Sequence, residues 1–285
     1  MVTWQGEGAG GRGIFQQRYA ANGGVVGSET WIGPGGTNPT VTAFASGGWE
    51  VTWQGTGAGD SQGIYQRHFA VDIVGTSHGD KLTGTSWSEY LAGKGGNDRL
   101  DGRGGDDVLA GGGGNDTYVV NSKGDQVEEL ASQGTDTVLA SISYTLTGTV
   151  ENLALSGKAG LNGTGNAVAN KITGNLGANT LKGLAGADQL TGGQGNDKLY
   201  GGSESDHFIF HKGDGTDTVK DFDAKGADHD VIDLSHISGI SDFADLKTNH
   251  MEQVGGSVVV HYTAHDSMAI EGVKIKELSS ADFQL

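Results

Sequence analysis

A nine-residue period is the feature that most constrains this chain. From Gly75 the sequence reads GTSHGDKLT, GTSWSEYLA, GKGGNDRLD, GRGGDDVLA and GGGGNDTYV; from Gly165 it reads GNAVANKIT, GNLGANTLK, GLAGADQLT, GGQGNDKLY and GGSESDHFI. All ten units begin with glycine, carry Asp, Glu or Asn at the sixth position, and carry a large apolar or aromatic residue at the eighth. Self-similarity at a fixed short period indicates a repeat architecture, in which each unit is buried by stacking on its neighbours.

Each unit divides into a six-residue turn and a three-residue strand. Glycine permits the positive φ values that such a turn requires. Because side chains alternate along a strand, the eighth-position residue is expected to point inward while Lys81, Arg99 and Asp101 point to water. Two units make one 18-residue coil. Turns on the same side are then two units apart in sequence and about 4.8 Å apart along the axis.

This coil predicts columns of acidic side chains. The stacked pairs are Asp80 over Asp98, Glu89 over Asp107, Asp98 over Asp116, Asn179 over Asp197, and Asp188 over Asp206. Two carboxylates ~5 Å apart repel by roughly 3 kcal/mol at an effective dielectric constant of about 20. A cation between each pair relieves the repulsion, and carboxylate and carbonyl oxygens favour calcium over zinc or copper. The alternative is a solvated acidic loop without metal.

Composition narrows the class of protein. The 285 residues include 53 glycines, two prolines and no cysteine, which excludes collagen and a disulfide framework. The net charge of −17 argues against binding to nucleic acid or to an anionic membrane surface. No apolar run approaches the ~20 residues of a membrane span. The first residues, MVTWQG, also lack the basic and apolar regions of a secretory signal peptide.

The units resemble those of the RTX (repeats-in-toxin) calcium-binding proteins. Gly111–Val119 and Gly192–Tyr200 match the family pattern G-G-x-G-x-D-x-Leu-x, and the resemblance covers nearly everything from residue 73 onward. It implies an all-β fold, a right-handed parallel β-roll with six-coordinate calcium between turns on the same side. In that family the earlier turn supplies its second and fourth carbonyls and its sixth side chain. The later turn supplies its first and third carbonyls and its sixth side chain.

Carried onto this chain, the resemblance implies five sites between turns. The ligand sets are Thr76, His78, Asp80, Gly93, Gly95 and Asp98; Thr85, Trp87, Glu89, Gly102, Gly104 and Asp107; Lys94, Gly96, Asp98, Gly111, Gly113 and Asp116; Asn175, Gly177, Asn179, Gly192, Gln194 and Asp197; and Leu184, Gly186, Asp188, Gly201, Ser203 and Asp206. Sites that use certain turns are expected to be weaker or empty, because residues there depart from the pattern; these residues are His78, Val168, Asn170 and Asn179. Asp221 and Asp230 resemble residues that hold a further ion where the roll closes in secreted RTX proteases and lipases.

The remaining sequence suggests further divisions. The stretch from Val2 recurs from Val51, and each copy has the pattern of a β-hairpin. The expected divisions are β-rich repeats of about 49 residues over 1–72, from an array continuing upstream; repeat blocks over 73–122 and 164–212; a connecting β segment over 123–163; and a C-terminal β-rich cap over 213–285. The tail also resembles the uncleaved C-terminal signal of type I secretion, and the two roles are compatible.

Other motifs fit their contexts poorly. Gly75–Gly79 matches the G-x-S-x-G nucleophile pattern but lies in the nine-residue frame rather than at a strand-to-helix turn. Gly6–Gly11 matches a dinucleotide fingerprint but lies in a hairpin turn. His207 and His211 are four residues apart on a predicted strand and turn, which argues against a zinc site. The N-terminal aromatic residues are expected in the core, with a carbohydrate-stacking platform as the alternative; they are Trp4, Trp31, Trp49, Trp53 and Tyr65.

These patterns predict a non-enzymatic, calcium-folded module of a larger secreted bacterial protein, located outside the cell or on its surface. The chain would pass unfolded through the type I secretion machinery and fold outside, where calcium binding contributes directly to folding. Two alternatives remain open. The chain could be the tail of a secreted lipase, protease or polysaccharide-modifying enzyme, or part of a surface adhesin array that binds glycans.

Overall fold

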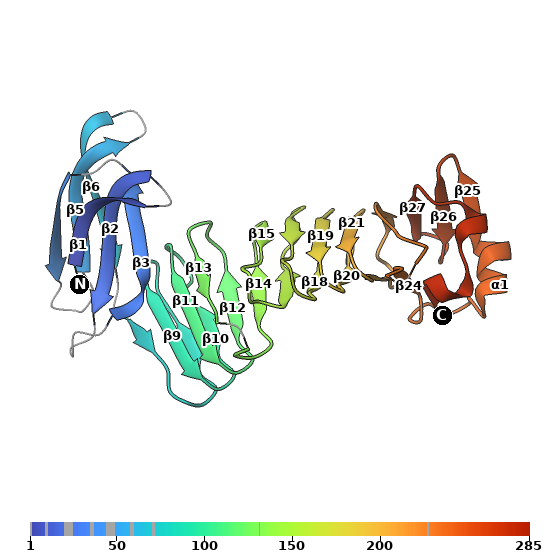
Figure 1. Cartoon of the computed structure of the whole chain (residues 1–285), viewed down its shortest axis with the longest axis horizontal. Helices are drawn as coiled ribbons and strands as arrows, with labels where there is room; N and C mark the ends of the chain where they lie inside the picture. Colours follow the sequence, from blue (N-terminus) through green and yellow to red (C-terminus); the bar gives the residue numbers. More distant parts are fainter. Residues whose placement is uncertain are drawn as a thin grey trace.

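The computed structural model describes residues 2–8, 11–19, 25–34, 37–43, 49–57, 60–69, 72–130, 132–226 and 228–285. Before residue 72, side chains are described for 38–42 and 51–54. The fold is mostly β, with short helices near the C-terminus. Figure 1 shows an elongated stack of strands with the N-terminal sheets at one end and the C-terminal elements at the other.

One parallel sheet of ten strands runs along the stack. In spatial order its strands are β8 (Lys81–Thr83), β10 (Arg99–Asp101), β12 (Thr117–Val120), β14 (Thr137–Ala140), β16 (Asn152–Leu155), β18 (Lys171–Thr173), β20 (Gln189–Thr191), β22 (His207–Ile209), β24 (Val231–Asp233) and β28 (Phe283–Gln284). Leu82 pairs with Leu100, and Leu100 with Tyr118. This register of 18 residues is the one that the nonapeptide period predicts.

The opposite face is divided into two sheets. The first contains β7 (Ile73–Val74), β9 (Tyr90–Gly95), β11 (Val108–Gly113) and β13 (Gln126–Glu128). The second contains β15 (Tyr144–Thr145), β17 (Asn162–Thr164), β19 (Thr180–Ala185), β21 (Lys198–Ser203), β23 (Thr216–Val219), β27 (Ser267–Glu271), β26 (Ser257–His261) and β25 (Met251–Val254). The division falls between β13 and β15, inside the segment that connects the two repeat blocks.

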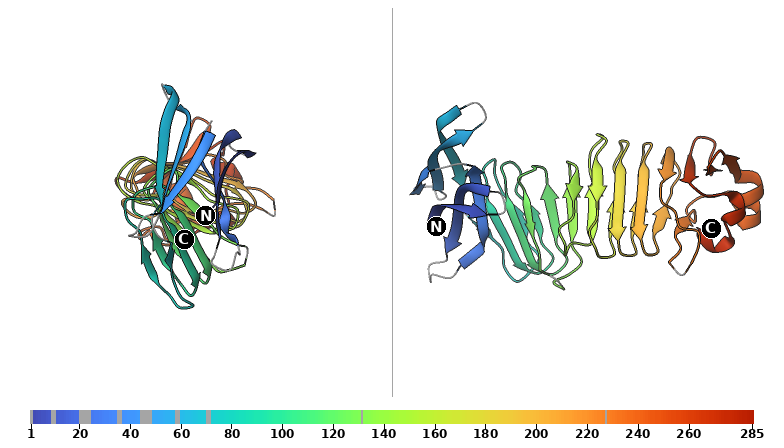
Figure 2. Two further views of the ribbon diagram at one scale, coloured as in Figure 1. Left: turned by 90° about the vertical axis from the view of Figure 1, so that its left-hand side faces the viewer. Right: turned by 45° about the horizontal axis from the view of Figure 1, so that its top comes forward.

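The connecting segment is built into the same parallel β-solenoid. Tyr118 pairs with Val138, Val138 with Leu153, and Leu153 with Ile172, so β14 and β16 carry the ten-stranded sheet from one block to the next. The inward apolar position persists here without the nonapeptide frame, since Val138 and Leu153 are both buried. The two blocks are therefore parts of one continuous solenoid, and Figure 2 shows their coils stacked along the long axis.

A row of eighth-position side chains forms the core. All ten are buried, as the alternation predicts; they are Leu82, Leu91, Leu100, Leu109, Tyr118, Ile172, Leu181, Leu190, Leu199 and Phe208. Burying one side chain of this size stabilises a fold by about 1.5–3 kcal/mol. The core therefore contains only one large side chain per strand across its width. The turns at the edges of each coil lie outside this core and need other stabilising interactions.

The N-terminal region contains two three-stranded antiparallel sheets, β1-β2-β3 and β4-β5-β6. Their strands are β1 (Val2–Gly8), β2 (Gly11–Tyr19), β3 (Val25–Pro34), β4 (Thr37–Ala43), β5 (Trp49–Gly57) and β6 (Asp60–Phe69). The pairs β1–β2 and β5–β6 are the hairpins that the repeated sequence predicts. Trp53 is buried, as expected of a core residue. The side chains of the other aromatic residues with that expectation, Trp4, Trp31, Trp49 and Tyr65, lie outside the described part.

The C-terminal region closes the solenoid. It contains α1 (Phe243–Asp245), η1 (Leu246–His250), η2 (Ile275–Glu277) and η3 (Ser280–Asp282). Strand β28 pairs with β24 at the end of the ten-stranded sheet, and the ring of Phe283 lies 5.7 Å from that of Phe243. None of the helices in the described part of the chain has the length and apolarity needed to span a membrane.

Candidate metal centres along the two edges of the solenoid

The acidic side chains lie in two columns, one at each edge of the solenoid. The first edge comprises the turns that enter the ten-stranded sheet, and the second edge comprises the turns that enter the opposite face. The sixth-position residues and their equivalents on the first edge are Asp80, Asp98, Asp116, Asp136, Glu151, Asn170, Asp188, Asp206 and Asp230; those on the second edge are Glu89, Asp107, Asp125, Asn179, Asp197 and Asp217.

Hydrogen bonds connect neighbouring members of each column. The backbone N–H of Asp98 donates to Oδ1 of Asp116 at 2.7 Å, and the N–H of Asp188 donates to Oδ1 of Asp206 at 2.8 Å. The same bond joins Asp80 to Asp98, Glu89 to Asp107, Asp107 to Asp125, Asp116 to Asp136, Asn179 to Asp197, Asp197 to Asp217, and Asp206 to Asp230. One oxygen of each later carboxylate is therefore committed to the preceding coil.

The second oxygen of most of these carboxylates has no such partner. Within the described part of the chain, the buried carboxylate oxygens without a hydrogen-bond partner are Oε2 of Glu89 and Oδ2 of Asp98, Asp107, Asp116, Asp188, Asp197, Asp206 and Asp217. A buried carboxylate oxygen is costly to leave without a hydrogen bond, an ion pair or a metal ion. Eight such atoms in two columns are the structural observation that a set of cation sites explains.

Burial also changes the acidity of these groups. Desolvation, reinforced by the neighbouring Asp125 carboxylate, raises the pKa of Asp107 to about 8. Desolvation is likewise the main cause that raises the pKa of Asp188 and Asp206 to about 7 and of Asp217 to about 8. A carboxyl group that is difficult to ionise alone ionises readily when a cation takes the place of its proton.

First-position glycines leave room for these oxygens. A Cβ on Gly93 would lie 2.1 Å from Oδ2 of Asp98, and one on Gly183 would lie 2.0 Å from Oδ2 of Asp188. The carboxylate thus folds back over the first residue of its own unit, which must be glycine. At the second position Lys94 and Leu184 have φ values of 80° and 87°, although they are not glycine. The turn geometry is therefore maintained even where it strains the backbone.

Comparison with known proteins agrees with this geometry. A family model described as the RTX calcium-binding nonapeptide repeat matches residues 83–118 and 173–208, in four copies. The chain carries RTX calcium-binding repeats. Such repeats typically bind Ca²⁺ and are typical of secreted bacterial proteins. The predicted columns and the matched repeats coincide in both blocks.

Among curated proteins, nothing matches the chain. Among solved structures, the extracellular lipase LipA from Serratia marcescens matches with 19% identity and a TM-score of 0.38, over 75% of this chain and 40% of the lipase. The AlgE6R3 subunit of the mannuronan C5-epimerase from Azotobacter vinelandii matches with 26% identity and a TM-score of 0.35, over 49% of this chain and 81% of the subunit. The chain thus spans less than half the length of the lipase.

In three of the predicted ligand sets, both acidic residues have a buried oxygen without a hydrogen-bond partner among the described residues. These are the sets built on Asp98 with Asp116, on Glu89 with Asp107, and on Asp188 with Asp206. Predicted carbonyl ligands lie beside these carboxylates. The position of a Cβ on Gly93, 2.1 Å from Oδ2 of Asp98, is 2.6 Å from the carbonyl oxygen of Gly111. The position of a Cβ on Gly183, 2.0 Å from Oδ2 of Asp188, is 2.5 Å from the carbonyl oxygen of Gly201. The individual metal bonds remain predictions.

The first RTX turn of the chain differs from these three. Oδ2 of Asp80 accepts hydrogen bonds from the backbone N–H of Thr76 at 2.6 Å and from its hydroxyl at 2.9 Å. These bonds hold the pKa of Asp80 below its usual value. His78 lies on the exposed part of this turn. Oδ2 of Asp80 therefore has hydrogen-bond partners within its own turn, and the weaker calcium site expected there stays a prediction.

In the asparagine turns, the side-chain amides also have hydrogen-bond partners within the protein. Oδ1 of Asn179 accepts from the N–H of Asn175 at 2.8 Å, and its Nδ2 donates to the carbonyl of Leu161 at 3.0 Å. Nδ2 of Asn175 donates to the carbonyls of Ser156 and Ala159 at 2.9 and 3.0 Å. On the predicted site between Asn179 and Asp197, only Asp197 has a buried oxygen without a partner among the described residues.

The structure extends the columns to residues that the nonapeptide frame misses. Asp136 and Asp217 accept from the N–H groups of Asp116 and Asp197 at 2.8 and 2.9 Å. Both belong to the sequence Gly-Thr-Asp-Thr-Val, which occurs at 134–138 and at 215–219. This five-residue repeat was the available signal: it places an acidic residue in the column, but 20 residues after its partner instead of 18.

The predicted pair Asp221 and Asp230 lies at the end of the first edge. Oδ1 of Asp230 accepts from the N–H of Asp206 at 2.9 Å, and Oδ1 of Asp221 accepts from the N–H of Gly201 at 2.9 Å. Burial is the main cause of the raised pKa of Asp206, and both of these carboxylates add to it. The structure therefore brings the three acidic groups close enough to interact, and the calcium ion expected there stays a prediction.

Proposed function

We propose that this chain is a calcium-folded RTX module of a larger secreted bacterial protein, and that the residues present here have no catalytic role. The observation that carries the proposal is the set of buried carboxylate oxygens, in both columns, that have no hydrogen-bond partner among the described residues. First-position glycines leave the space beside these oxygens that a side chain would fill. Calcium would supply the positive charge and the preference for oxygen ligands that these positions require.

Linkage between binding and folding gives the mechanism. In the unfolded chain the carboxylates are apart and hydrated, whereas the solenoid stacks Asp98 on Asp116 and Asp188 on Asp206. An ion that binds only the folded chain stabilises it by about 4 kcal/mol per site at a thousandfold excess over its dissociation constant. Free calcium is scarce in the cytosol and abundant outside the cell, so the chain would fold after export.

The C-terminal region would serve two successive roles. In the unfolded chain, residues 213–285 would be available to the type I secretion machinery as an uncleaved signal. In the folded chain, β28 pairs with β24 and covers the end of the ten-stranded sheet. Folding would thus withdraw the signal once export is complete.

The N-terminal repeats favour a second candidate function at the level of the whole protein. Two copies of a hairpin unit in tandem are expected of an array, and an adhesin would use such an array to present a glycan-binding surface. The other alternative is the non-catalytic tail of a secreted RTX enzyme. A glycan array probed with the chain distinguishes them, because specific glycan binding supports the adhesin and its absence favours the tail.

Circular dichroism with and without calcium tests the main proposal. We expect much of the β signal to be lost in chelator and to return after calcium is added, with magnesium at the same concentration as the control. Magnesium requires near-ideal octahedral geometry and should substitute poorly. A full β signal in chelator that calcium leaves unchanged would overturn the proposal.

A further inference from the structure

A carboxylate from outside the nonapeptide frame meets the first-edge column at the end of the first block. One carboxylate oxygen each of Asp116, Glu129 and Asp136 lies within 4.8 Å of the other two. Asp116 and Asp136 are 1% and 2% exposed, and Glu129 is half-buried. Glu129 follows β13, directly before the division of the opposite face into two sheets.

Asp116 supplies the evidence that a cation binds at this cluster. Its Oδ1 accepts a hydrogen bond from the backbone N–H of Asp98 at 2.7 Å. Its Oδ2 is buried and has no hydrogen-bond partner among the residues that the structure describes. A Cβ on Gly111 would lie 2.1 Å from this Oδ2 and 2.2 Å from the hydroxyl of Tyr118. The unpartnered oxygen therefore lies beside the hydroxyl that holds Glu129.

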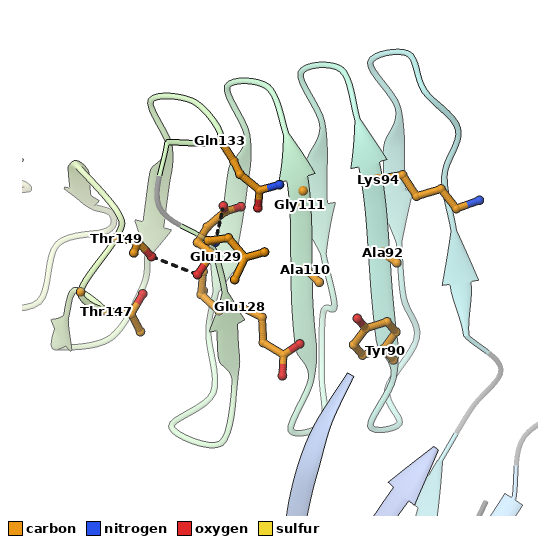
Figure 3. Close-up of a pocket in the computed structure, with 14 residues that line it drawn as sticks. Tyr90, Ala92, Lys94, Ala110, Gly111, Glu128, Glu129, Gln133, Thr147 and Thr149 are labelled. Carbon is orange, nitrogen blue, oxygen red and sulfur yellow. Dashed lines mark hydrogen bonds between the residues drawn. The ribbon is translucent and has the colours of Figure 1, made fainter. Parts of the chain in front are cut away.

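Tyr118 positions Glu129. Its hydroxyl donates to Oε1 of Glu129 and accepts from the N–H of Gly111 at 3.1 Å. Thr149 donates to the backbone carbonyl of Glu129 at 3.2 Å, which Figure 3 shows. The corresponding aromatic residue of the second block is Phe208, which has no hydroxyl. The arrangement is therefore specific to the first block.

A cavity of about 690 Å³ gives access to this cluster. Its lining includes Gly111, Gly112, Glu129 and Thr149. Lys94 also lines the cavity, but Figure 3 shows its side chain pointing away from Glu129. An ion could reach the cluster from solvent through this opening, and Lys94 is not directed at Glu129 as a counter-charge.

We propose that Asp116, Glu129 and Asp136 bind a calcium ion that joins the first block to the connecting segment. Two oxygens that share a calcium ion at 2.3–2.6 Å can be at most about 5.2 Å apart, and the observed limit of 4.8 Å satisfies this condition. Three carboxylates at such distances repel strongly unless a cation lies between them. The proposal rests on the proposed function for the identity of the ion. Of its three residues, Glu129 and Asp136 lie outside the predicted ligand sets, and Asp116 is shared with the predicted site of Asp98.

Ion counting with a matched pair of variants tests the proposal. The substitutions are Glu129→Gln and Glu128→Gln, which remove the same charge from adjacent residues that line the same cavity. Bound calcium is measured on the full chain by equilibrium dialysis at saturating free calcium. We expect E129Q to bind one ion fewer than the wild type, or to bind one ion at least tenfold more weakly, and E128Q to match the wild type. Equal binding by all three proteins overturns the inference.

Terbium luminescence supplies a second measurement, and the midpoint of its titration does not depend on folding yield. Terbium replaces calcium at oxygen-rich sites, and a tyrosine beside the ion transfers excitation energy to it. We expect Tyr118→Phe to lose one component of the tyrosine-sensitised emission and to weaken that site about tenfold, as losing a positioning group does. Unchanged emission and affinity in Y118F would contradict the assigned geometry. A wild type that binds no calcium at all would instead refute the proposed function.

Discussion

The asparagine turns and the aspartate turns of the solenoid differ in how their sixth-position side chains are hydrogen-bonded. At Asp188 and Asp206 a buried carboxylate oxygen has no hydrogen-bond partner among the described residues. At Asn170 the side-chain amide instead donates to the carbonyls of Val150 and Glu151 at 3.3 and 3.2 Å. Asn179 makes the equivalent bond to Leu161 on the second edge.

The difference shows what the metal is needed for. In each kind of turn, backbone carbonyls of one coil and a side chain of the next must share a small buried space. An amide nitrogen carries its own protons and can donate them to those carbonyls, whereas a carboxylate has only acceptors and needs a cation to bind the same oxygens. We therefore expect some coils to stay folded without calcium, namely those that contain Asn166, Asn170, Asn175 and Asn179. The coils on either side of them should unfold.

Calcium removal should produce the largest effect, and it should affect the aspartate turns more than the asparagine turns. In chelator, we expect amide hydrogens at the aspartate turns, such as the N–H of Asp98 and Asp188, to lose protection by about a hundredfold more than that of Asn179. A hundredfold excess of ligand over its dissociation constant corresponds to ~2.7 kcal/mol. Hydrogen exchange read by mass spectrometry measures the difference. Uniform loss along the whole solenoid would mean that the asparagine turns give no independent support.

The pH dependence of the metal-free protein should follow next in size. Burial raises the pKa of Asp188 to about 7 and that of Asp107 to about 8, from the ordinary value of 3.8 for an aspartate. Between these limits the folded chain retains protons that the unfolded chain has lost, so each rise in pH favours unfolding. In chelator, stability should therefore be highest in acid and fall as the pH rises from about 4 to about 8.

Chemical denaturation in chelator at pH 5.5 and pH 8 measures this trend, with the same pair in calcium as the control. Asp80 and Asp266 have lowered pKa values, so their contribution is lost only below about pH 4 and falls outside the window. With calcium bound, the carboxylates are already deprotonated and the trend should reverse. Metal-free stability that rises between pH 5.5 and pH 8 would contradict the buried, unpartnered state of these groups.

The sequence was sufficient to predict the coil, because the period of nine determines which residues lie inside and which residues stack. Leu100 over Leu82 and Asp116 over Asp98 follow from 18-residue spacing alone. The continuity of the solenoid through β14 and β16 was not predictable in this way, since those coils contain 20, 15 and 19 residues. Glu129 was missed for the same reason: it lies outside the frame, and only the folded coil brings it to Asp116.

Exchanging one asparagine for aspartate should convert a turn of one kind into the other, with the smallest effect of the three. In chelator, Asn179→Asp loses the hydrogen bond to the Leu161 carbonyl and adds a buried charge, for a cost of about 1–3 kcal/mol. Calcium should restore the loss, because the new carboxylate stands over Asp197, whose Oδ2 is buried and has no partner in the described part of the chain. Denaturation of N179D and wild type with and without calcium measures both the loss and its recovery.

Asn249→Asp is the control: it lies on the exposed surface of the C-terminal cap, makes the same chemical change outside either column, and should leave the calcium dependence unchanged. If N179D is destabilised equally in calcium and in chelator, calcium bound to an aspartate does not replace the hydrogen bonds of the asparagine, and the comparison of the two turns is wrong.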